Sequence, residues 1–127
     1  MSDKSVAQKL QIRANRTVLF VNAPGDYDAT LGGLPEGVFV VKKAHGLIDI
    51  IQVFVGSRND LEEQLPRLKP LIAPGGMLWV TYHKGTSQTP ADMNRDTIAR
   101  YARSLGMHAV AQVAVDADWS ALRLKII

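Results

Sequence analysis

Two continuously apolar segments constrain the fold of this chain more than any other feature. Residues 18–21 read Val-Leu-Phe-Val, and residues 49–55 are apolar apart from Asp49 and Gln52. A strand that is apolar on both faces is typical of a parallel sheet covered by helices on each side. Helical patterns lie between such segments, and alternation of this kind predicts a three-layer α/β fold with right-handed crossovers.

The boundaries of the expected elements follow from periodicity and from turn residues. Ser57 is placed to cap a helix with Asp60, and Pro66 predicts either a kink or a second short helix. The short link at residues 116–118 permits only an antiparallel pair at the end of the chain. We expect strands at 17–22, 38–41, 49–55, 77–82, 108–115 and 119–126, and helical segments at 4–12, 26–31, from 57 onward and at 94–105.

Composition limits the classes of protein to which the chain can belong. Its 127 residues, 46% of them apolar, suit a single domain over residues 1–127. The absence of cysteine excludes disulfides, thiolate metal sites and cysteine nucleophiles. No apolar stretch approaches the ~20 residues that span a bilayer, and the first residues lack the pattern of a secretion signal. We therefore expect a cytoplasmic protein without a membrane partner.

Several segments resemble class I methyltransferases. Residues 16–21 resemble their first strand, residues 49–51 the opening of a central strand, residues 71–78 the following Pro-Gly-Gly turn, and residues 106–127 the terminal hairpin. The chain resembles most a small bacterial family with no assigned activity, which shares the Asn22-Ala23-Pro24 turn and the loop at 84–87. That family resembles methyltransferases shortened between strands two and four. The resemblance implies a Rossmann-like, methyltransferase-like domain with a mostly parallel six-stranded sheet in the order 2-1-3-4-6-5, in which strand six is antiparallel and forms a C-terminal antiparallel hairpin with strand five.

The chain departs from that family pattern where S-adenosylmethionine would bind. An apolar residue or Asn22 stands where the enzymes have an acidic residue, and the turn at residues 24–27 has one glycine where they have several. Lys42 and Lys43 follow strand two, where an acidic residue would accept hydrogen bonds from the ribose hydroxyls. We therefore expect no cofactor.

The sequence gives little support for a phosphate-binding P-loop, a metal site or a nucleic-acid site. The chain contains no G-x-x-x-x-G-K-[ST] motif, and His45, His83 and His108 lack the spacing of metal ligands. The net charge of +3 comes from dispersed basic residues. Lys9, Arg13 and Arg16 form the densest cluster, but it has no aromatic partners that could stack on bases. Nucleic acid is therefore an improbable partner, and we expect no metal site.

One group of polar residues remains as a candidate site. In open α/β sheets, ligands bind beyond the carboxyl ends of the strands. There, cationic and hydroxyl side chains together with helix-start amides would suit a small anion, with Arg58, Lys84 and Ser87 as its main ligands. The candidate ligand-binding residues are Asn22, Asp26, Tyr27, Ser57, Arg58, His83, Lys84 and Ser87.

Two functions from different classes fit these observations. The first is a non-catalytic binding module that holds a small anionic ligand or a protein partner at the former cofactor mouth. The second is an enzyme, either a divergent methyltransferase or an acid–base catalyst that uses His83 with Asp26 or Tyr27. The lack of a nucleophile, metal set or cofactor loop favours the first, so no catalytic residue is assigned. A homodimer through an uncovered sheet edge or the terminal hairpin is also compatible with the sequence.

Overall fold

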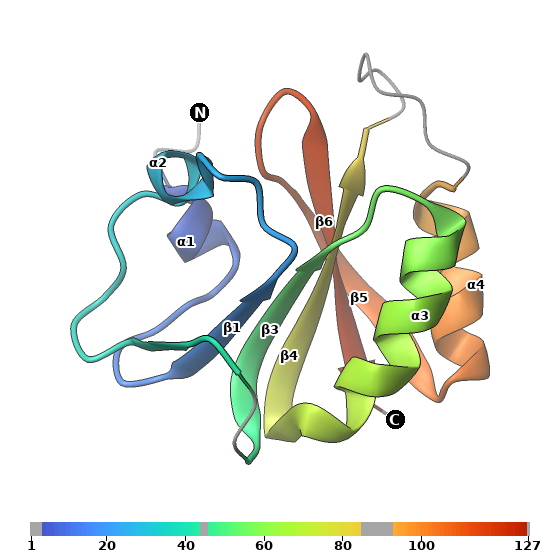
Figure 1. Ribbon diagram of the computed structural model, residues 1–127, viewed down its shortest axis with the longest axis horizontal. Helices are drawn as coiled ribbons and strands as arrows, with labels where there is room; N and C mark the ends of the chain where they lie inside the picture. Colours follow the sequence, from blue (N-terminus) through green and yellow to red (C-terminus); the bar gives the residue numbers. More distant parts are fainter. Residues whose placement is uncertain (1–3, 44–45, 85–92, 127) are drawn as a thin grey trace.

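A twisted six-stranded sheet forms the centre of the protein (Figure 1). The computed structural model describes residues 4–43, 46–84 and 93–126. The strand order is β2-β1-β3-β4-β6-β5, which confirms the predicted order. The strands are β1 Thr17–Val21, β2 Phe39–Val41, β3 Ile48–Phe54, β4 Ile72–His83, β5 Met107–Ala114 and β6 Trp119–Ile126.

The pairing of the strands also agrees with the prediction. Strands β2, β1, β3 and β4 are parallel neighbours. Strand β6 is antiparallel to both β4 and β5, and the link at residues 116–118 closes the terminal hairpin. The sheet is therefore mostly parallel, with a C-terminal antiparallel hairpin.

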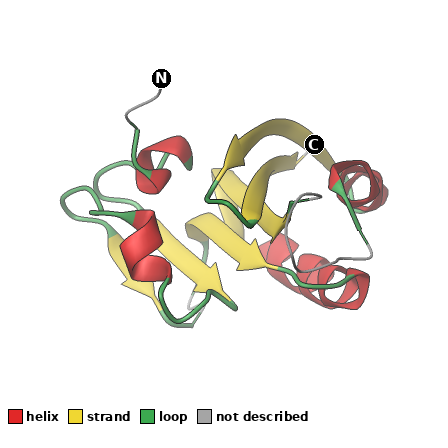
Figure 2. Ribbon diagram, turned by 90° about the horizontal axis from the view of Figure 1, so that it is seen from above, coloured by secondary structure: helices red, strands yellow, loops and turns green. Residues whose placement is uncertain are grey.

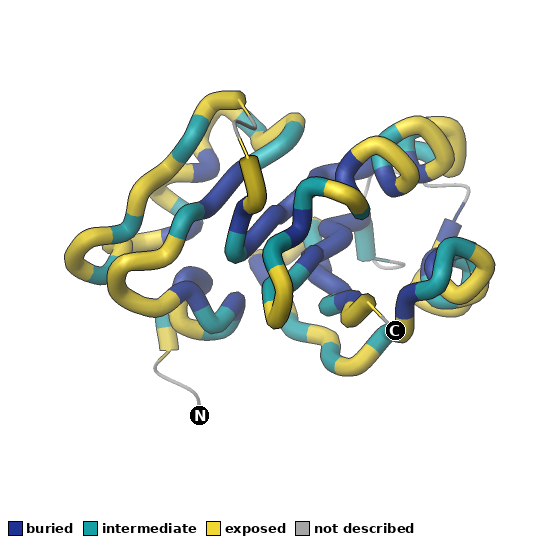
Figure 3. The backbone as a smooth tube through the Cα atoms, turned by 90° about the horizontal axis from the view of Figure 1, so that it is seen from below, coloured by how far each residue is buried: buried dark blue, intermediate teal, exposed yellow. Residues whose placement is uncertain are grey.

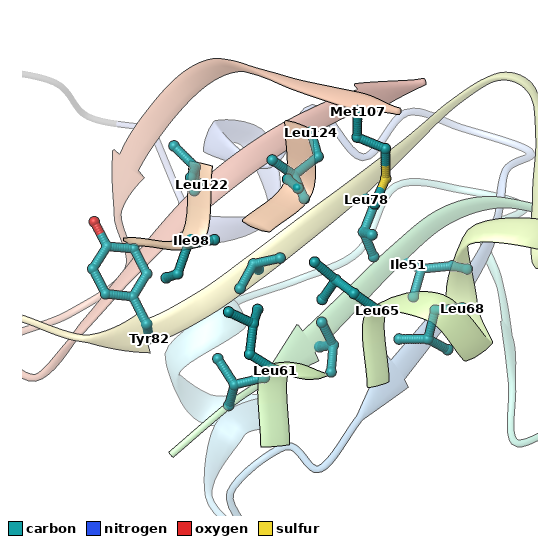
Figure 4. Close-up of a cluster of buried hydrophobic side chains, with 14 of the residues drawn as sticks. Ile51, Leu61, Leu65, Leu68, Leu78, Tyr82, Ile98, Met107, Leu122 and Leu124 are labelled. Atoms are coloured by element: carbon teal, nitrogen blue, oxygen red, sulfur yellow. The ribbon is translucent and has the colours of Figure 1, made fainter. Parts of the chain in front are cut away.

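Helices lie on both faces of the sheet and complete three layers (Figure 2). The side chains of α3 and α4 pack into one apolar cluster, shown in Figure 4, and those of α1 and α2 pack into a second cluster on the opposite face. The central strands are buried, whereas the helices expose their outer surfaces (Figure 3). The helices are α1 Val6–Lys9, α2 Tyr27–Leu31, α3 Arg58–Leu68 and α4 Arg95–Ser104, and a 3₁₀ turn, η1 Lys69–Leu71, follows α3. In the part of the chain that the structure describes, no helix is long and apolar enough to cross a bilayer.

The first helix is shorter than the sequence predicted. An apolar stripe suggested residues 4–12, but α1 covers Val6–Lys9 only. Gln11 adopts a left-handed conformation with φ of 61°, which ends the helical path before Ile12. Ser5 and Gln8 form a reciprocal capping box at its start.

Pro66 does not divide the third helix, so of the two predicted alternatives the division into two short helices is wrong. Helix α3 is continuous from Arg58 to Leu68. A proline at position 66 leaves the carbonyl of Glu62 without its usual helical donor. The hydroxyl of Tyr101, on α4, lies 3.4 Å from that carbonyl and donates to it, so a neighbouring helix partly replaces the lost bond.

Strand β4 begins earlier than predicted, because the Pro-Gly-Gly segment is a bulge inside the strand and does not precede it. Ile72 already pairs with Ile48, and pairing resumes between Met77 and Ile50. Residues 73–76 form the irregular segment between these pairs. A Cβ atom at Gly76 would lie 2.8 Å from the carbonyl oxygens of Ala73 and Asp49, so the bulge requires glycine there.

The connection from β2 to β3 is unusually short. Residues 42–47 alone join the two strands, although β1 lies between them in the sheet. Parallel strands are normally joined by a dozen or more residues that include a helix. This short crossover is the shortening expected in the middle of the domain, and it leaves the neighbouring surface of β1 open.

Candidate functional site

A cleft of about 380 Å³ lies beside the short crossover. Its walls come from β1, from the first residues of the crossover and from the last turn of α3 with η1. Leu19, Val21, Leu68 and Leu71 give it an apolar component. Its polar residues are Asn22, Lys42, Lys43 and Arg67.

The charge of the cleft has one sign. Lys42, Lys43 and Arg67 are cationic, and no carboxylate stands among the lining residues that the structure describes. All three side chains are exposed, so water screens them and each contributes modestly to binding. Arg67 is oriented by a 2.8 Å bond from Nη2 to Gln64 Oε1. The arrangement suits an anionic group at the rim and apolar atoms below it.

A larger hollow, of about 690 Å³, shares Lys42 and Lys43 with this cleft. It is lined mainly by apolar residues of β2 and the crossover, including Phe39 and Leu47. These two side chains are 67% and 59% exposed, respectively, which is high for residues of their size. The open surface beside the crossover is therefore apolar over a wide area, with the two lysines at the boundary between the hollows.

Among the predicted site residues that the structure describes, Asn22 alone lines this cleft. It follows β1 directly and adopts a left-handed conformation, with φ of 59°. Asp26 lies further along the same turn, exposed, at the start of α2, and makes no side-chain capping bond there. The turn after β1 thus brings one polar side chain to the cleft.

Tyr27 is part of a buried polar chain. Its hydroxyl donates to Gln52 Oε1 at 2.6 Å, and Gln52 Nε2 donates to Thr81 Oγ1 at 2.9 Å. The Tyr27 side chain is 4% exposed, and burial raises its pKa well above the ordinary value. Phe20 and Phe54 pack edge-on against its ring. These contacts give Tyr27 a structural role between α2 and the sheet.

Ser57 and Arg58 open helix α3. Ser57 Oγ accepts a bond from the amide of Asp60, as predicted, while the Asp60 carboxylate accepts from Gly56 and so does not complete a capping box. Arg58 Nε lies 3.3 Å from Glu62 Oε1, in an exposed ion pair. Part of the cationic charge assigned to the predicted anion site is thus engaged within the helix.

His83 and Lys84 end strand β4. The His83 ring stacks on Trp119 with 3.9 Å between ring centroids, and its buried Nδ1 has no hydrogen-bond partner among the described residues. The amide of Lys84 donates to the carbonyl of Asp118 at 2.8 Å. Ser87 lies outside the described residues, so the site formed by Arg58, Lys84 and Ser87 stays a prediction.

The cleft residues Lys42, Lys43 and Arg67 were missed as ligand groups. The two lysines were noted only as the loss of a ribose acceptor, although a pair of cations after a strand is itself a signal for an anion. Arg67 carried no signal, because its place beside them depends on the path of the crossover. For metals, no cluster of three His, Asp or Glu side chains occurs in the described ranges.

Solved structures similar to this chain share its fold. The DhpI–SAH complex superposes with a TM-score of 0.65 at 12% identity, over 95% of this chain and 82% of that one. An rRNA methylase from Streptococcus thermophilus superposes with a TM-score of 0.61 at 11% identity, over 100% of this chain and 99% of that one. The B. subtilis tRNA methyltransferase TrmK superposes with a TM-score of 0.59 at 11% identity, over 99% of this chain and 67% of that one.

These similarities define the fold and nothing finer, because the identities are 11–12%. The chain has a class I methyltransferase-like, Rossmann-like fold, in a form shortened to 127 residues. No protein-family model matches the sequence, and a search of the curated proteins finds no match.

Proposed function

We propose that this protein is a non-catalytic binding module that holds a small organic anion in the cleft beside the crossover. The observation that carries the proposal is the lining of that cleft, in which Lys42, Lys43 and Arg67 border apolar side chains. A carboxylate or phosphate ester with an apolar body matches such a lining, because its head group can meet the cations while its body lies against the half-buried Val21 and Leu71.

The residues around the cleft favour binding over methyl transfer. Lysines supply hydrogen-bond donors only, so Lys42 and Lys43 cannot accept from the hydroxyls of a ribose. The turn after β1 contains a single glycine, Gly25, and ends at the buried Tyr27. A loop of this kind gives a cofactor little of the close backbone approach that glycine-rich turns provide.

The acid–base alternative has weaker support. The Tyr27 hydroxyl donates a hydrogen bond to Gln52 in the buried layer, and its raised pKa disfavours ionisation near neutral pH. His83 packs on Trp119 at the end of β4. The rings of Phe54 and Trp119 lie between those of Tyr27 and His83 in a continuous series of ring contacts, which favours a packing role for both.

A divergent methyltransferase is the second candidate. It is favoured by the fold and by the names of similar structures, among them an rRNA methylase and complexes of DhpI with SAH and SAM. S-adenosylmethionine is therefore the comparison ligand in any binding test. The cytoplasmic location, the possible homodimer and the possible protein partner stay predictions.

Calorimetry with three probes tests the proposal. Octanoate carries an anionic head and an apolar body, octanol lacks the charge, and S-adenosylmethionine represents the enzyme. We expect octanoate to bind, and octanol and S-adenosylmethionine to bind at least tenfold more weakly.

A double variant tests the role of the lysines. In Lys42→Gln/Lys43→Gln, loss of two exposed interactions of about 0.5–1 kcal/mol each would weaken octanoate roughly five- to thirty-fold. Arg100→Gln/Arg103→Gln removes the same charge from exposed positions of α4 outside the cleft and should leave the affinity unchanged. Equal affinities in the two variants, or tight binding of S-adenosylmethionine by the wild type, would overturn the proposal.

A further inference from the structure

A second cationic cleft lies at the opposite end of the parallel strands, away from Asn22. It has a volume of about 270 Å³ and is bounded by the segment before β1, the first residues of β3 and the Pro-Gly-Gly bulge of β4. Arg13, Arg16 and Arg123 line it together with one carboxylate, Asp49. In the sequence, Arg13 and Arg16 belong to the densest group of basic residues. The fold adds Arg123, from a strand more than 100 positions later.

Arg123 is the most constrained of the three arginines. Its side chain is half-buried on β6, and Nη1 donates to Gln11 Oε1 at 3.2 Å. Its Nε atom is buried and has no hydrogen-bond partner among the described residues. A buried donor of this kind normally has an acceptor, so Arg123 keeps an unused donor beside the cleft that it lines.

The other charges leave the cleft with an excess of cations. The side chains of Arg13 and Arg16 are exposed, and they form neither an ion pair nor a side-chain hydrogen bond with other described residues. Asp49 Oδ2 accepts the amide of Thr17 at 2.9 Å, so part of its capacity is used by the backbone. Three guanidinium groups against one carboxylate leave an excess of two positive charges.

We propose that this cleft binds a small phosphate-bearing ligand. A phosphate group carries close to two negative charges at neutral pH, which matches the excess, whereas a monocarboxylate carries one. Guanidinium groups bind phosphate oxygens through paired N–H donors, and three of them converge here. The volume suits a phosphate, a pyrophosphate or one esterified phosphate better than a whole nucleotide cofactor.

The bulge of β4 completes one wall and extends the site. Pro74, Gly75 and Gly76 line this cleft and also an adjoining one of about 300 Å³, which Arg123 shares and to which Lys125 contributes. Gly76 cannot carry a side chain without meeting two carbonyl oxygens. The glycines therefore keep this wall free of side chains, and their amide signals are convenient reporters of a ligand.

Titration of the whole chain with inorganic pyrophosphate at constant ionic strength tests the proposal, with acetate as the carboxylate comparison. We expect pyrophosphate to bind, acetate to bind at least tenfold more weakly, and the amide signals of Gly75 and Gly76 to shift during the titration. Arg123→Gln should weaken pyrophosphate about tenfold or more. Arg100→Gln removes an exposed arginine of α4 and should have no effect.

A second variant covers the case in which Arg123→Gln unfolds. Arg13→Gln/Arg16→Gln changes two exposed side chains and should weaken pyrophosphate by a similar factor without loss of structure. The proposal is overturned by an unchanged affinity in this double variant, by shifts at Asn22 and Lys43 in place of the bulge, or by no binding up to about 10 mM. A single-stranded RNA oligomer that binds a hundredfold or more tighter than pyrophosphate would also overturn it, in favour of nucleic acid. The crossover cleft is a separate site, so either proposal can fail alone.

Discussion

The hydroxyl of Tyr27 donates a 2.6 Å hydrogen bond to Oε1 of Gln52, and both side chains are buried between α2 and the sheet. The bond joins a short helix to the central strand β3, and Gln52 in turn donates a hydrogen bond to Thr81 of β4. It is therefore the main polar tie between the short second helix and the core of the sheet.

Loss of this bond should destabilise the protein. Tyr27→Phe keeps the ring contacts but leaves the Gln52 carbonyl oxygen buried without its donor. We expect the free energy of unfolding to fall by about 1–3 kcal/mol, measured by urea denaturation at neutral pH. A loss below about 0.3 kcal/mol would mean that the bond contributes little.

The same tyrosine makes stability depend on alkaline pH. Burial raises the pKa of Tyr27 above its ordinary value of 10.0, so the folded protein retains a proton that the unfolded chain releases. The stabilisation is complete below pH 10 and is lost as the pH rises above it. We expect the stability advantage of the wild type over Tyr27→Phe to shrink as the pH rises from 10 to about 12, in parallel urea titrations. An advantage that stays constant or grows over this range would contradict the assignment.

Gly76 should be far less tolerant of a side chain than Gly25. Gly76→Ala places Cβ 2.8 Å from two backbone oxygens in the β4 bulge, whereas a Cβ at Gly25 meets nothing within 4 Å. We expect a loss of about 1–3 kcal/mol for Gly76→Ala and no loss for Gly25→Ala in chemical denaturation. Equal stabilities would show that the bulge can relax.

The cap of α3 offers another matched comparison. Ser57 Oγ accepts the amide of Asp60, while Asp26 occupies the equivalent position of α2 without a side-chain bond. Ser57→Ala should therefore cost about 1 kcal/mol and Asp26→Ala less than about 0.5 kcal/mol, by thermal or urea unfolding. The reverse ranking would refute the capping assignment.

Most of the architecture could be predicted because its signals are local. Strands β1 and β3 are apolar on both faces, and the link at residues 116–118 is too short for anything but a hairpin, so the sheet class and the terminal hairpin followed directly. The strand order rested on the resemblance to class I methyltransferases. The errors came from tertiary contacts. Tyr101 offers a donor to the carbonyl that Pro66 leaves free, and pairing of Ile72 with Ile48 places the glycine bulge inside β4.

The candidate sites were less predictable, because they depend on where separate segments meet. The rule that ligands bind beyond the carboxyl ends of strands placed Asn22 near a cleft. The sequence did not show that Lys43 and Arg67 line the same cleft, because they come from separate elements of the fold. Arg123 joins Arg13 through strand β6, which a linear pattern cannot show.

Amide-resolved NMR of the wild type, titrated first with octanoate and then with S-adenosylmethionine, tests the central proposal most directly. The proposal predicts octanoate shifts confined to residues 19–22, 42–43, 67–68 and 71, lost in Lys42→Gln/Lys43→Gln, and no displacement by S-adenosylmethionine. Shifts that persist in the double variant, or displacement of octanoate by S-adenosylmethionine with new shifts along the turn after β1, would contradict a non-catalytic anion-binding module and favour the methyltransferase.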